Sequence, residues 1–332
     1  MWFFGVGKSL HNKYSMPLKN LFITGSTGNI GACLLDVLHV QYRNKLNVIA
    51  GCHQAEPNET VSIKSKSNQV MDIDYDDPLS VEICLRNVDI LFLVPPPSRN
   101  REQQCLTIVK IALKMNVSYI VLVSLLGSES RAGLFCSQFR NIELGIEATK
   151  IPFTFLQCSP LQQNMIPFSL FGGIGTIAMP IGMQKYAPIH VNDVARCAVS
   201  SFFIKATCIM DPMQHHGQKY RLTGPELLSG VEIAGKASLG LKIPVGFTNC
   251  NVFEAREIMT IRSSPKSKWA IQGFMEIYEL ISRGFFAHVS PDVAKLNFFK
   301  GITCEEFFTD NRDYFIHARN TEAPHPFTIS RL

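Results

Sequence analysis

The sequence predicts an α/β protein with a doubly wound parallel sheet and a smaller, helix-rich C-terminal region. From residue 18 to residue 158, short and almost continuous apolar runs alternate with segments whose apolar residues recur at helical spacing. Strands that are apolar along their whole length are typical of parallel sheets covered by helices on both faces. After about residue 206 the patterns become mostly helical. We therefore expect a flexible extension at 1–17, a sheet domain at 18–206, and a smaller region at 207–332 packed over the sheet edge.

The alternation gives a definite order of elements. Apolar runs predict strands at residues 19–25, 46–52, 68–75, 89–97, 118–126 and 152–158. Helical periodicity predicts helices at residues 29–43, 77–88, 102–117 and 137–150, and an Asp-Pro pair marks the start of the second helix. Further on, the patterns predict helices at 227–241 and 267–286 and a short strand at 243–250. Strands that alternate with helices in this way predict a parallel sheet with crossover helices.

One long segment, 151–184, contains no charged residue, yet we do not expect it to cross a membrane. A membrane-spanning helix needs about 20 mostly apolar residues without interruption. This segment carries four prolines and four glycines, which interrupt helices. The segment therefore predicts a buried strand followed by a glycine-rich loop that could form the wall of a pocket.

Composition excludes several classes of protein. Of 332 residues, 46% are hydrophobic and 18% are charged, which is typical of a globular chain and not of a disordered one. The net charge of +5 is small and spread along the chain, so it predicts no nucleic-acid partner. Ten cysteines occur without any Cys-x-x-Cys pair. They predict reduced, mostly buried thiols in a cytoplasmic protein, with no disulfide framework and no metal site.

The stretch "LFITGSTGNIG", from Leu21 to Gly31, places three glycines at the junction of the first strand and the first helix. Gly25 would allow the tight turn, Gly28 would let a pyrophosphate approach the backbone, and Gly31 would let the helix pack closely on the sheet. The helix N-terminus would offer free N–H groups and a partial positive charge to phosphates. The predicted cofactor-binding residues of this loop are Thr24, Gly25, Ser26, Thr27, Gly28, Asn29, Ile30 and Gly31.

In this setting "TGSTGNIG" resembles the atypical short-chain dehydrogenase/reductases, and more narrowly the NmrA-like family. The resemblance continues through "VDILFLVPP", "IALKMNVSYIVLVS", "YAPIHVNDVARCAV" and two long C-terminal stretches that begin at Tyr220 and Gly284. It extends from Leu18 to Phe315, and its late motifs are the most specific. The resemblance implies a Rossmann-type, NAD(P)-binding fold for residues 18–206.

The end of the second strand decides between NAD and NADP. An acidic residue there would bind the free ribose of NAD, whereas His53 and Gln54 stand here instead. We therefore expect NADP, with NAD as the alternative, and His53, helped by Lys64 or Lys66, would contact the 2′-phosphate. The resemblance implies that the adenine and the ribose are flanked by Asp72, Val94, Pro95 and Pro96.

The catalytic residues cannot be identified from the sequence. Short-chain reductases commonly use a tyrosine with a lysine four residues later, and none of the eight tyrosines has one. The resemblance implies a lysine, or a histidine with a lysine, as general acid on the helix after the fifth strand, where this chain has Phe135 and Phe139. These two residues and Asn164 are the predicted substrate-binding residues.

Ser124 ends the fifth strand, where a short-chain enzyme has a serine beside the cofactor and the substrate. We count it among the cofactor-binding residues, although a hydroxyl that only caps the next turn would look the same in the sequence. His190 and Asp193 are interpreted as structural, with Asn192 or Asp193 capping the helix that follows.

Two functions remain open. The first is an NADP(H)-dependent oxidoreductase that acts on a quinone-like or unsaturated carbonyl substrate, because such acceptors do not strictly need a protein acid. The second is a non-catalytic NAD(P) sensor that regulates a protein partner. Either protein would be a monomer or a homodimer, without nucleic-acid or membrane partners.

Overall fold

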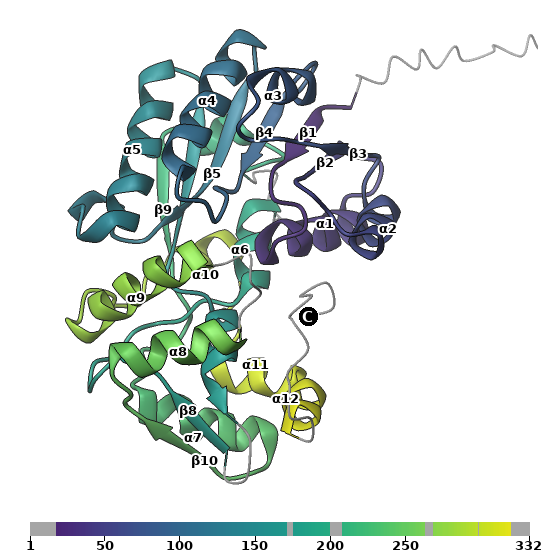
Figure 1. The fold of residues 1–332 in the computed structure, drawn as a ribbon. Coiled ribbons are helices and arrows are strands. Elements are labelled where there is room, and N and C mark those ends of the chain that lie inside the picture. The colour runs from purple at the N-terminus through teal and green to yellow at the C-terminus, as the bar shows by residue number, and fades with distance from the viewer. Residues whose placement is uncertain (1–17, 171–174, 200–207, 263–267, 298, 320–332) are drawn as a thin grey trace, which may run out of the picture.

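A computed structural model describes residues 18–170, 175–199, 208–262, 268–297 and 299–319 of the chain. The predicted extension at 1–17 and the predicted boundary at 206/207 lie outside these residues. Two layers of helices enclose one large sheet, and the C-terminal region lies against the carboxyl edge of that sheet (Figure 1).

The large sheet has seven parallel strands in the order β3-β2-β1-β4-β5-β6-β9. Its strands are β1 (Asn20–Ile23), β2 (Asn47–Cys52), β3 (Gln69–Asp72), β4 (Ile90–Leu93), β5 (Tyr119–Leu125), β6 (Phe153–Cys158) and β9 (Gln218–Leu222). The chain leaves β1 toward β2 and later returns to the other side of β1 as β4. Ligands of open α/β sheets bind at such a reversal, outside the carboxyl ends of the strands.

The helices of the sheet domain cover both faces, as the apolar strands predicted. They are α1 (Asn29–Gln41), α2 (Pro57–Lys66), α3 (Pro78–Cys84), α4 (Arg101–Lys114), α5 (Gly133–Thr149) and α6 (Val191–Val199). Leu21 and Ile23 of β1 pack into one core with α1 and α6, whereas Phe22 packs into a second core with α3, α4 and α5. This alternation gives each strand two buried faces, and the predicted doubly wound sheet is confirmed.

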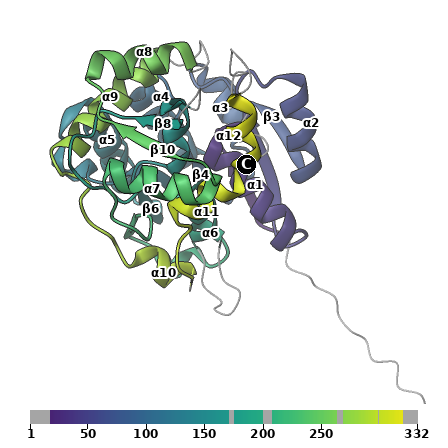
Figure 2. The same ribbon diagram turned by 90° about the horizontal axis from the view of Figure 1, so that it is seen from below.

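The C-terminal region has a third core and a small second sheet. Its helices are α7 (Gly230–Leu241), α8 (Val252–Arg262), α9 (Lys268–Ser282), α10 (Asp292–Asn297), α11 (Cys304–Asp310) and α12 (Arg312–Arg319). The second sheet contains β7 (Ser169–Leu170), β8 (Gly175–Ala178) and β10 (Val245–Thr248). Viewed from below, α7, α8 and α9 lie on the side of α4, α5 and β6, whereas α1, α2 and β3 lie on the other side (Figure 2).

Short 3-10 helices complete the fold at η1 (Ser128–Ser130), η2 (Gln162–Phe168) and η3 (Pro212–His215). Among the described residues, every helix is too short or too polar to cross a bilayer. All ten cysteines are buried free thiols, which confirms the prediction from their spacing.

Several elements were not predicted, among them α2, β7, β8, α8 and β9. Helix α2 buries only Ile63, so it has no apolar periodicity, and it begins instead with Pro57 and a capping box between Glu56 and Glu59. Strand β9 lies at the edge of the sheet and buries only Leu222. The strands β7 and β8 are too short to show a pattern, and they lie in the segment expected to be a loop.

Candidate functional site

The loop between β1 and α1 depends on two of its three glycines for its shape. Gly25 has a φ of +61°, and its N–H donates a 3.1 Å hydrogen bond to the hydroxyl group of the buried Tyr75. A β-carbon on Gly31 would collide with Gly25, whose carbonyl carbon would lie 2.8 Å away. Gly31 therefore lets α1 pack closely on the loop itself, whereas the sequence predicted that it would let α1 pack closely on the sheet. Gly25 makes the tight turn, as expected.

Gly28 is exposed and differs from the other two glycines. A β-carbon there would lie 3.3 Å from the carbonyl oxygen of Gly25, and no other atom would come within 4 Å. Its φ of −82° suits any residue. A β-carbon at 28 would thus make one tight contact that needs a shift of a few tenths of an ångström, without strain in φ, whereas a ligand that approaches the backbone here would require a glycine.

The side chains of Thr24 and Ser26 form hydrogen bonds inside the protein. The Thr24 hydroxyl accepts a 2.8 Å bond from the N–H of Val94, and the Ser26 hydroxyl donates a 3.0 Å bond to the carbonyl of Ile23. Both residues are fully buried. These bonds hold the loop against β4, and the more exposed residues of the loop are Thr27, Gly28, Asn29 and Ile30.

The N-terminus of α1 suits an anion. Gly28 is the N-cap residue, so no side chain caps the helix, and the first turn contains no acidic residue. The partial positive charge of the helix end is therefore not neutralised locally. Backbone N–H groups at such an end bind phosphates in dinucleotide-binding proteins.

His53 and Asp72 lie at neighbouring strand ends. Asp72 is the exposed last residue of β3 and pairs with Cys52, the residue before His53. The exposed His53 places Nδ1 2.9 Å from the carbonyl oxygen of Ile73, and only the tautomer protonated at Nδ1 can donate to that carbonyl. Nε2 is then the ring nitrogen that remains for a ligand, and it can donate to a phosphate only in the imidazolium form, in which both nitrogens carry a proton.

Lys64 and Lys66 lie at the opposite end of α2 from His53, and Lys66 lines a small pocket together with Ser26 and Thr27 of the glycine loop. Both lie in the last turn of α2, whereas His53 precedes its first turn. A helix of ten residues spans about 15 Å. Lys66 also forms an ion pair with Asp36 of α1 at 2.5 Å. His53 and Lys66 therefore both remain candidates for contact with a 2′-phosphate, from opposite ends of α2.

Val94, Pro95 and Pro96 follow β4 and lie beside the glycine loop. A β-carbon on Gly25 would be 3.5 Å from the β-carbon of Val94. The carbonyl oxygen of Pro96 accepts a 2.8 Å hydrogen bond from Nε of Arg101. The structure thus brings together three predicted segments, after β1, β2 and β4, at the carboxyl edge of the sheet.

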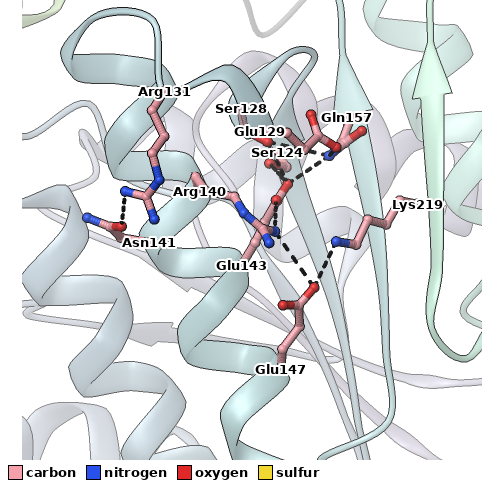
Figure 3. Close-up of polar contacts among 10 residues, drawn as sticks. All are labelled: Ser124, Ser128, Glu129, Arg131, Arg140, Asn141, Glu143, Glu147, Gln157 and Lys219. Carbon is pink, nitrogen blue, oxygen red and sulfur yellow. Dashed lines mark hydrogen bonds and ion pairs between the residues drawn. The ribbon is translucent and has the colours of Figure 1, made fainter.

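Ser124 belongs to a buried polar network that sequence reasoning missed (Figure 3). Its hydroxyl donates a 2.6 Å bond to Oε1 of Glu143, and that oxygen also accepts bonds from Ser128 and Gln157, each at 3.0 Å. Arg140 donates to Oε2 of the same carboxylate at 3.0 Å. The only signal in the sequence was an acid beside Ile142, on the apolar face of α5.

The network continues across the sheet. Arg140 lies 3.7 Å from a carboxylate oxygen of Glu147, which also pairs with Lys219 of β9 at 2.8 Å (Figure 3). Gln157 of β6 also donates to Glu129 at 2.7 Å. These contacts fix α5 against β5, β6 and β9. The Ser124 hydroxyl therefore donates within the protein, to Glu143 of α5, and not to the turn after β5 that the structural alternative named.

The predicted substrate-binding residues differ in burial, and only Phe135 is fully packed inside the protein. Phe135 is 7% exposed, and a β-carbon on Gly273 of α9 would overlap its ring. Phe139 is half-buried. The guanidinium carbon of Arg101 lies 4.3 Å from the Phe135 ring centroid and 5.1 Å from that of Phe139. Asn164, also half-buried, accepts a 3.2 Å bond from Tyr278 at its backbone carbonyl.

His190 and Asp193 do not form an acid–base pair. Burial lowers the pKa of His190 to about 4, and its Nδ1 accepts a hydrogen bond from the N–H of Asn192. Burial raises the pKa of Asp193 to about 6, and its carboxylate accepts a 2.7 Å bond from the N–H of Ile302. Asp193 thus anchors the segment before α11, where a cap for α6 was expected. Among the described residues, no three His, Cys, Asp or Glu side chains gather as metal ligands.

Comparisons with known proteins agree with this architecture. No family model matches the chain. The NAD(P)H azoreductase of Xenophilus azovorans is 24% identical over 289 residues, which cover 86% of this chain and 96% of that protein.

Three similar solved structures share the fold over almost their whole length. The Citrobacter sp. triphenylmethane reductase, complexed with NADP(H), has a TM-score of 0.73 at 19% identity and covers 88% of this chain and 99% of its own. The NADPH-dependent quinone oxidoreductase QOR2 of Escherichia coli, complexed with NADPH, has a TM-score of 0.72 at 19% identity, with 87% and 99% covered. NmrA, a negative transcriptional regulator, has a TM-score of 0.70 at 14% identity, with 92% and 99% covered. The chain therefore has the Rossmann-type fold that NmrA shares with these reductases, as the NmrA-like resemblance of its motifs predicted.

Proposed function

We propose that the protein is an NADP(H)-dependent oxidoreductase that reduces a quinone-like or other unsaturated carbonyl acceptor. The observation that carries the proposal is the glycine loop at the start of α1. Gly28 is exposed there in a backbone conformation that any residue can adopt, and the helix end above it carries no acidic residue. This arrangement fits a pyrophosphate, and the absence of an acid at His53 favours NADP over NAD.

The residues present fit a bound dinucleotide. Backbone N–H groups around Gly28 would hold the pyrophosphate, His53 would contact the 2′-phosphate, and Val94 and Pro95 would lie along the ribose at the end of β4. Asp72 is exposed one strand away, on the side expected for the adenine. The cofactor would supply the hydride, so the protein has to bind and orient the cofactor and the acceptor and to exclude water.

The described residues point to an acceptor that needs no immediate proton. The hydroxyl group of Ser124 donates its one hydrogen bond to Glu143, so it cannot also donate to a substrate oxygen. Phe135 and Phe139 occupy the helix positions where the NmrA-like resemblance implies a lysine or histidine that acts as general acid. Quinones accept a hydride and leave a stable anion, which water can protonate later. The azoreductase and QOR2 are named for flat, conjugated acceptors, which supports this substrate class.

The second candidate is a non-catalytic NAD(P) sensor that regulates a protein partner. It is favoured by the burial of Phe135 against α9, which leaves little of this side chain for a substrate. It also agrees with the structural similarity to NmrA, a transcriptional regulator. A cytoplasmic location and a monomeric or homodimeric state belong to both candidates and stay predictions.

One experiment separates the candidates. The purified protein is titrated with NADPH and with NADH by calorimetry, and a panel of quinones is then tested for oxidation of bound NADPH. Tight NADPH binding with quinone-dependent oxidation supports the oxidoreductase. Tight binding without oxidation by any acceptor supports the sensor, and no binding of either dinucleotide contradicts both.

A further inference from the structure

Arg101, the first residue of α4, is a buried cation beside the predicted substrate-binding residues. The residue is 4% exposed. Its Nε donates to the carbonyl oxygen of Pro96, and its guanidinium carbon lies over the ring faces of Phe135 and Phe139. The pKa of Arg101 is lowered by burial to about 10, so the side chain still carries its charge at neutral pH.

This placement is electrostatically costly. One terminal nitrogen, Nη1, is buried without a hydrogen-bond partner, and no carboxylate of the described residues lies within 4 Å of the guanidinium. A positive side chain in the first turn of a helix also opposes the positive end of the helix dipole. The two aromatic faces offset only part of the cost of burying an unpaired charge.

Carboxylates on adjoining elements are used by other groups. Glu276 of α9 accepts bonds from the N–H groups of Leu134 and Phe135, at 2.8 and 3.3 Å, and so caps α5. Asp76 accepts a 2.9 Å bond from the side chain of Gln104. The positive charge of Arg101 therefore has no counter-ion within the described part of the protein.

Arg101 is also placed on the side of the sheet where the acceptor is expected. Pro96, which holds its Nε, belongs to the segment after β4 whose Val94 bonds to Thr24 of the glycine loop. Phe135 and Phe139 belong to the first turns of α5, which begins at the same carboxyl edge. An anion bound by Arg101 would therefore lie between this segment and α5.

We propose that Arg101 binds the oxygen of the acceptor that becomes negatively charged during reduction. The inference rests on the proposed function and deepens it by naming the acceptor class: a flat aromatic carbonyl compound whose reduced product is an oxyanion. A quinone takes a hydride, that is two electrons and one proton, from the dihydronicotinamide of NADPH. The products are NADP⁺ and the hydroquinone monoanion. Arg101 keeps its protons throughout, and water protonates the monoanion after it leaves.

The binding test uses 2-hydroxy-1,4-naphthoquinone, which is a flat anion at neutral pH with its charge spread over oxygen atoms. Calorimetry with the NADP⁺-saturated protein avoids turnover. We expect the variant Arg101→Met to bind this anion at least tenfold more weakly than wild type, while its affinity for uncharged 1,4-naphthoquinone changes less than threefold. Equal loss for both compounds would overturn the proposal, since it would indicate a packing defect.

The kinetic test uses 1,4-naphthoquinone and NADPH. We expect kcat of Arg101→Met to fall by about 100-fold with little change in KM, because a group aimed at developing charge acts mainly in the transition state. Arg101→Lys keeps the charge but not the planar fork, and should lie between the two. The affinity for NADP⁺ should stay within threefold. A tenfold loss of NADP⁺ affinity would place the anion on the cofactor and contradict the proposal.

Stability separates this role from a structural one. Removing an unpaired buried charge should leave the thermal midpoint of Arg101→Met equal to that of wild type or higher, whereas a lower midpoint would indicate a structural role. Arg99→Met is the matched control, because it removes a neighbouring but exposed charge. It should leave anion binding and kcat unchanged.

If wild type binds the anion through Arg101 but oxidises no NADPH, the proposed function fails and the anion site stands. If wild type and Arg101→Met turn over quinone equally, the anion site fails and the function stands.

Discussion

The hydroxyl group of Ser124 donates a 2.6 Å hydrogen bond to the carboxylate of Glu143, and both side chains are buried. This pair joins the end of β5 to the middle of α5, beside the edge where a cofactor would bind. Because Ser128, Gln157 and Arg140 also donate to Glu143, the carboxylate has its hydrogen-bonding capacity filled (Figure 3). The pair therefore positions α5 and does not offer a proton to a substrate.

Replacing Glu143 by Gln should destabilise the fold. The amide keeps the shape but leaves the charge of Arg140 poorly paired and presents an NH₂ group to donors. We expect a loss of about 3 kcal/mol in the free energy of unfolding, measured with urea. The control is Glu147→Gln on the same helix, where both partners are partly exposed. It should cost less than about 1 kcal/mol. Equal losses in the two variants would show that the buried Glu143 network contributes no more stability than the partly exposed ion pairs of Glu147.

Gly28 and Gly31 should separate binding from folding. Gly28→Val should lower NADPH affinity more than tenfold while the far-UV circular dichroism stays near wild type, because the β-carbon makes one tight contact in the loop but would block the approach of a pyrophosphate. Gly31→Ala should lower the free energy of unfolding by about 1–3 kcal/mol, because its β-carbon collides with Gly25. Calorimetry and urea unfolding check the two effects. Unchanged NADPH affinity in Gly28→Val would refute the assigned pyrophosphate site.

His53→Asp should change the choice of cofactor. A carboxylate at this exposed position would repel a 2′-phosphate and could bind a free 2′-hydroxyl group. Two like charges about 4 Å apart near the surface disfavour each other by roughly 1 kcal/mol or more, so the ratio of NADPH to NADH affinity should fall about tenfold. Calorimetry with both dinucleotides measures this ratio. If Lys64→Ala, at the far end of α2, gave the same fall, the assignment to His53 would be wrong.

The sequence predicted the large sheet because apolar runs such as 118–126 report burial on both faces directly. It predicted the glycine loop for the same kind of reason, since a turn with φ of +61° at Gly25 selects for glycine. Helix α2 was missed because caps, and not an apolar face, define it. Glu143 and Arg101 were missed because their importance depends on partners 19 and 34 or more residues away, Ser124 and Phe135. Only the folded chain brings those partners together.

Asp193 should give the stability a distinct pH dependence. Burial raises its pKa in the folded protein to about 6, above the ordinary value of 3.8. The folded state therefore holds this proton more tightly, and the carboxyl group lowers stability as the pH rises from about 4 to about 6. His190 acts in the opposite direction, because burial lowers its pKa to about 4 and folding loses stability as the pH falls below about 6.5.

Asp193→Asn isolates the first effect. The variant should gain roughly 3 kcal/mol relative to wild type between pH 4 and pH 7, since one unit of pKa corresponds to about 1.4 kcal/mol. Its own stability should then rise with pH across the range where His190 loses its proton in the unfolded chain. Urea unfolding of both proteins at several pH values checks this. A constant difference between the two proteins across the range would contradict the raised pKa of Asp193.

The last prediction concerns the acceptor. None of the eight tyrosines is followed by lysine at the fourth position, Phe135 and Phe139 replace the expected polar residues, and Ser124 is bonded to Glu143. Loss of a general acid typically lowers a rate by about 10²–10⁴-fold. NADPH oxidation should therefore proceed with quinones and be absent or very slow with simple ketones and aldehydes. Spectrophotometric assays of all three classes at saturating NADPH test this. Reduction of a ketone or an aldehyde at an ordinary rate, on the order of 10 s⁻¹, would mean that the protein supplies a proton. Ser124 would then have to release Glu143 during the reaction, and Ser124→Ala should abolish that activity.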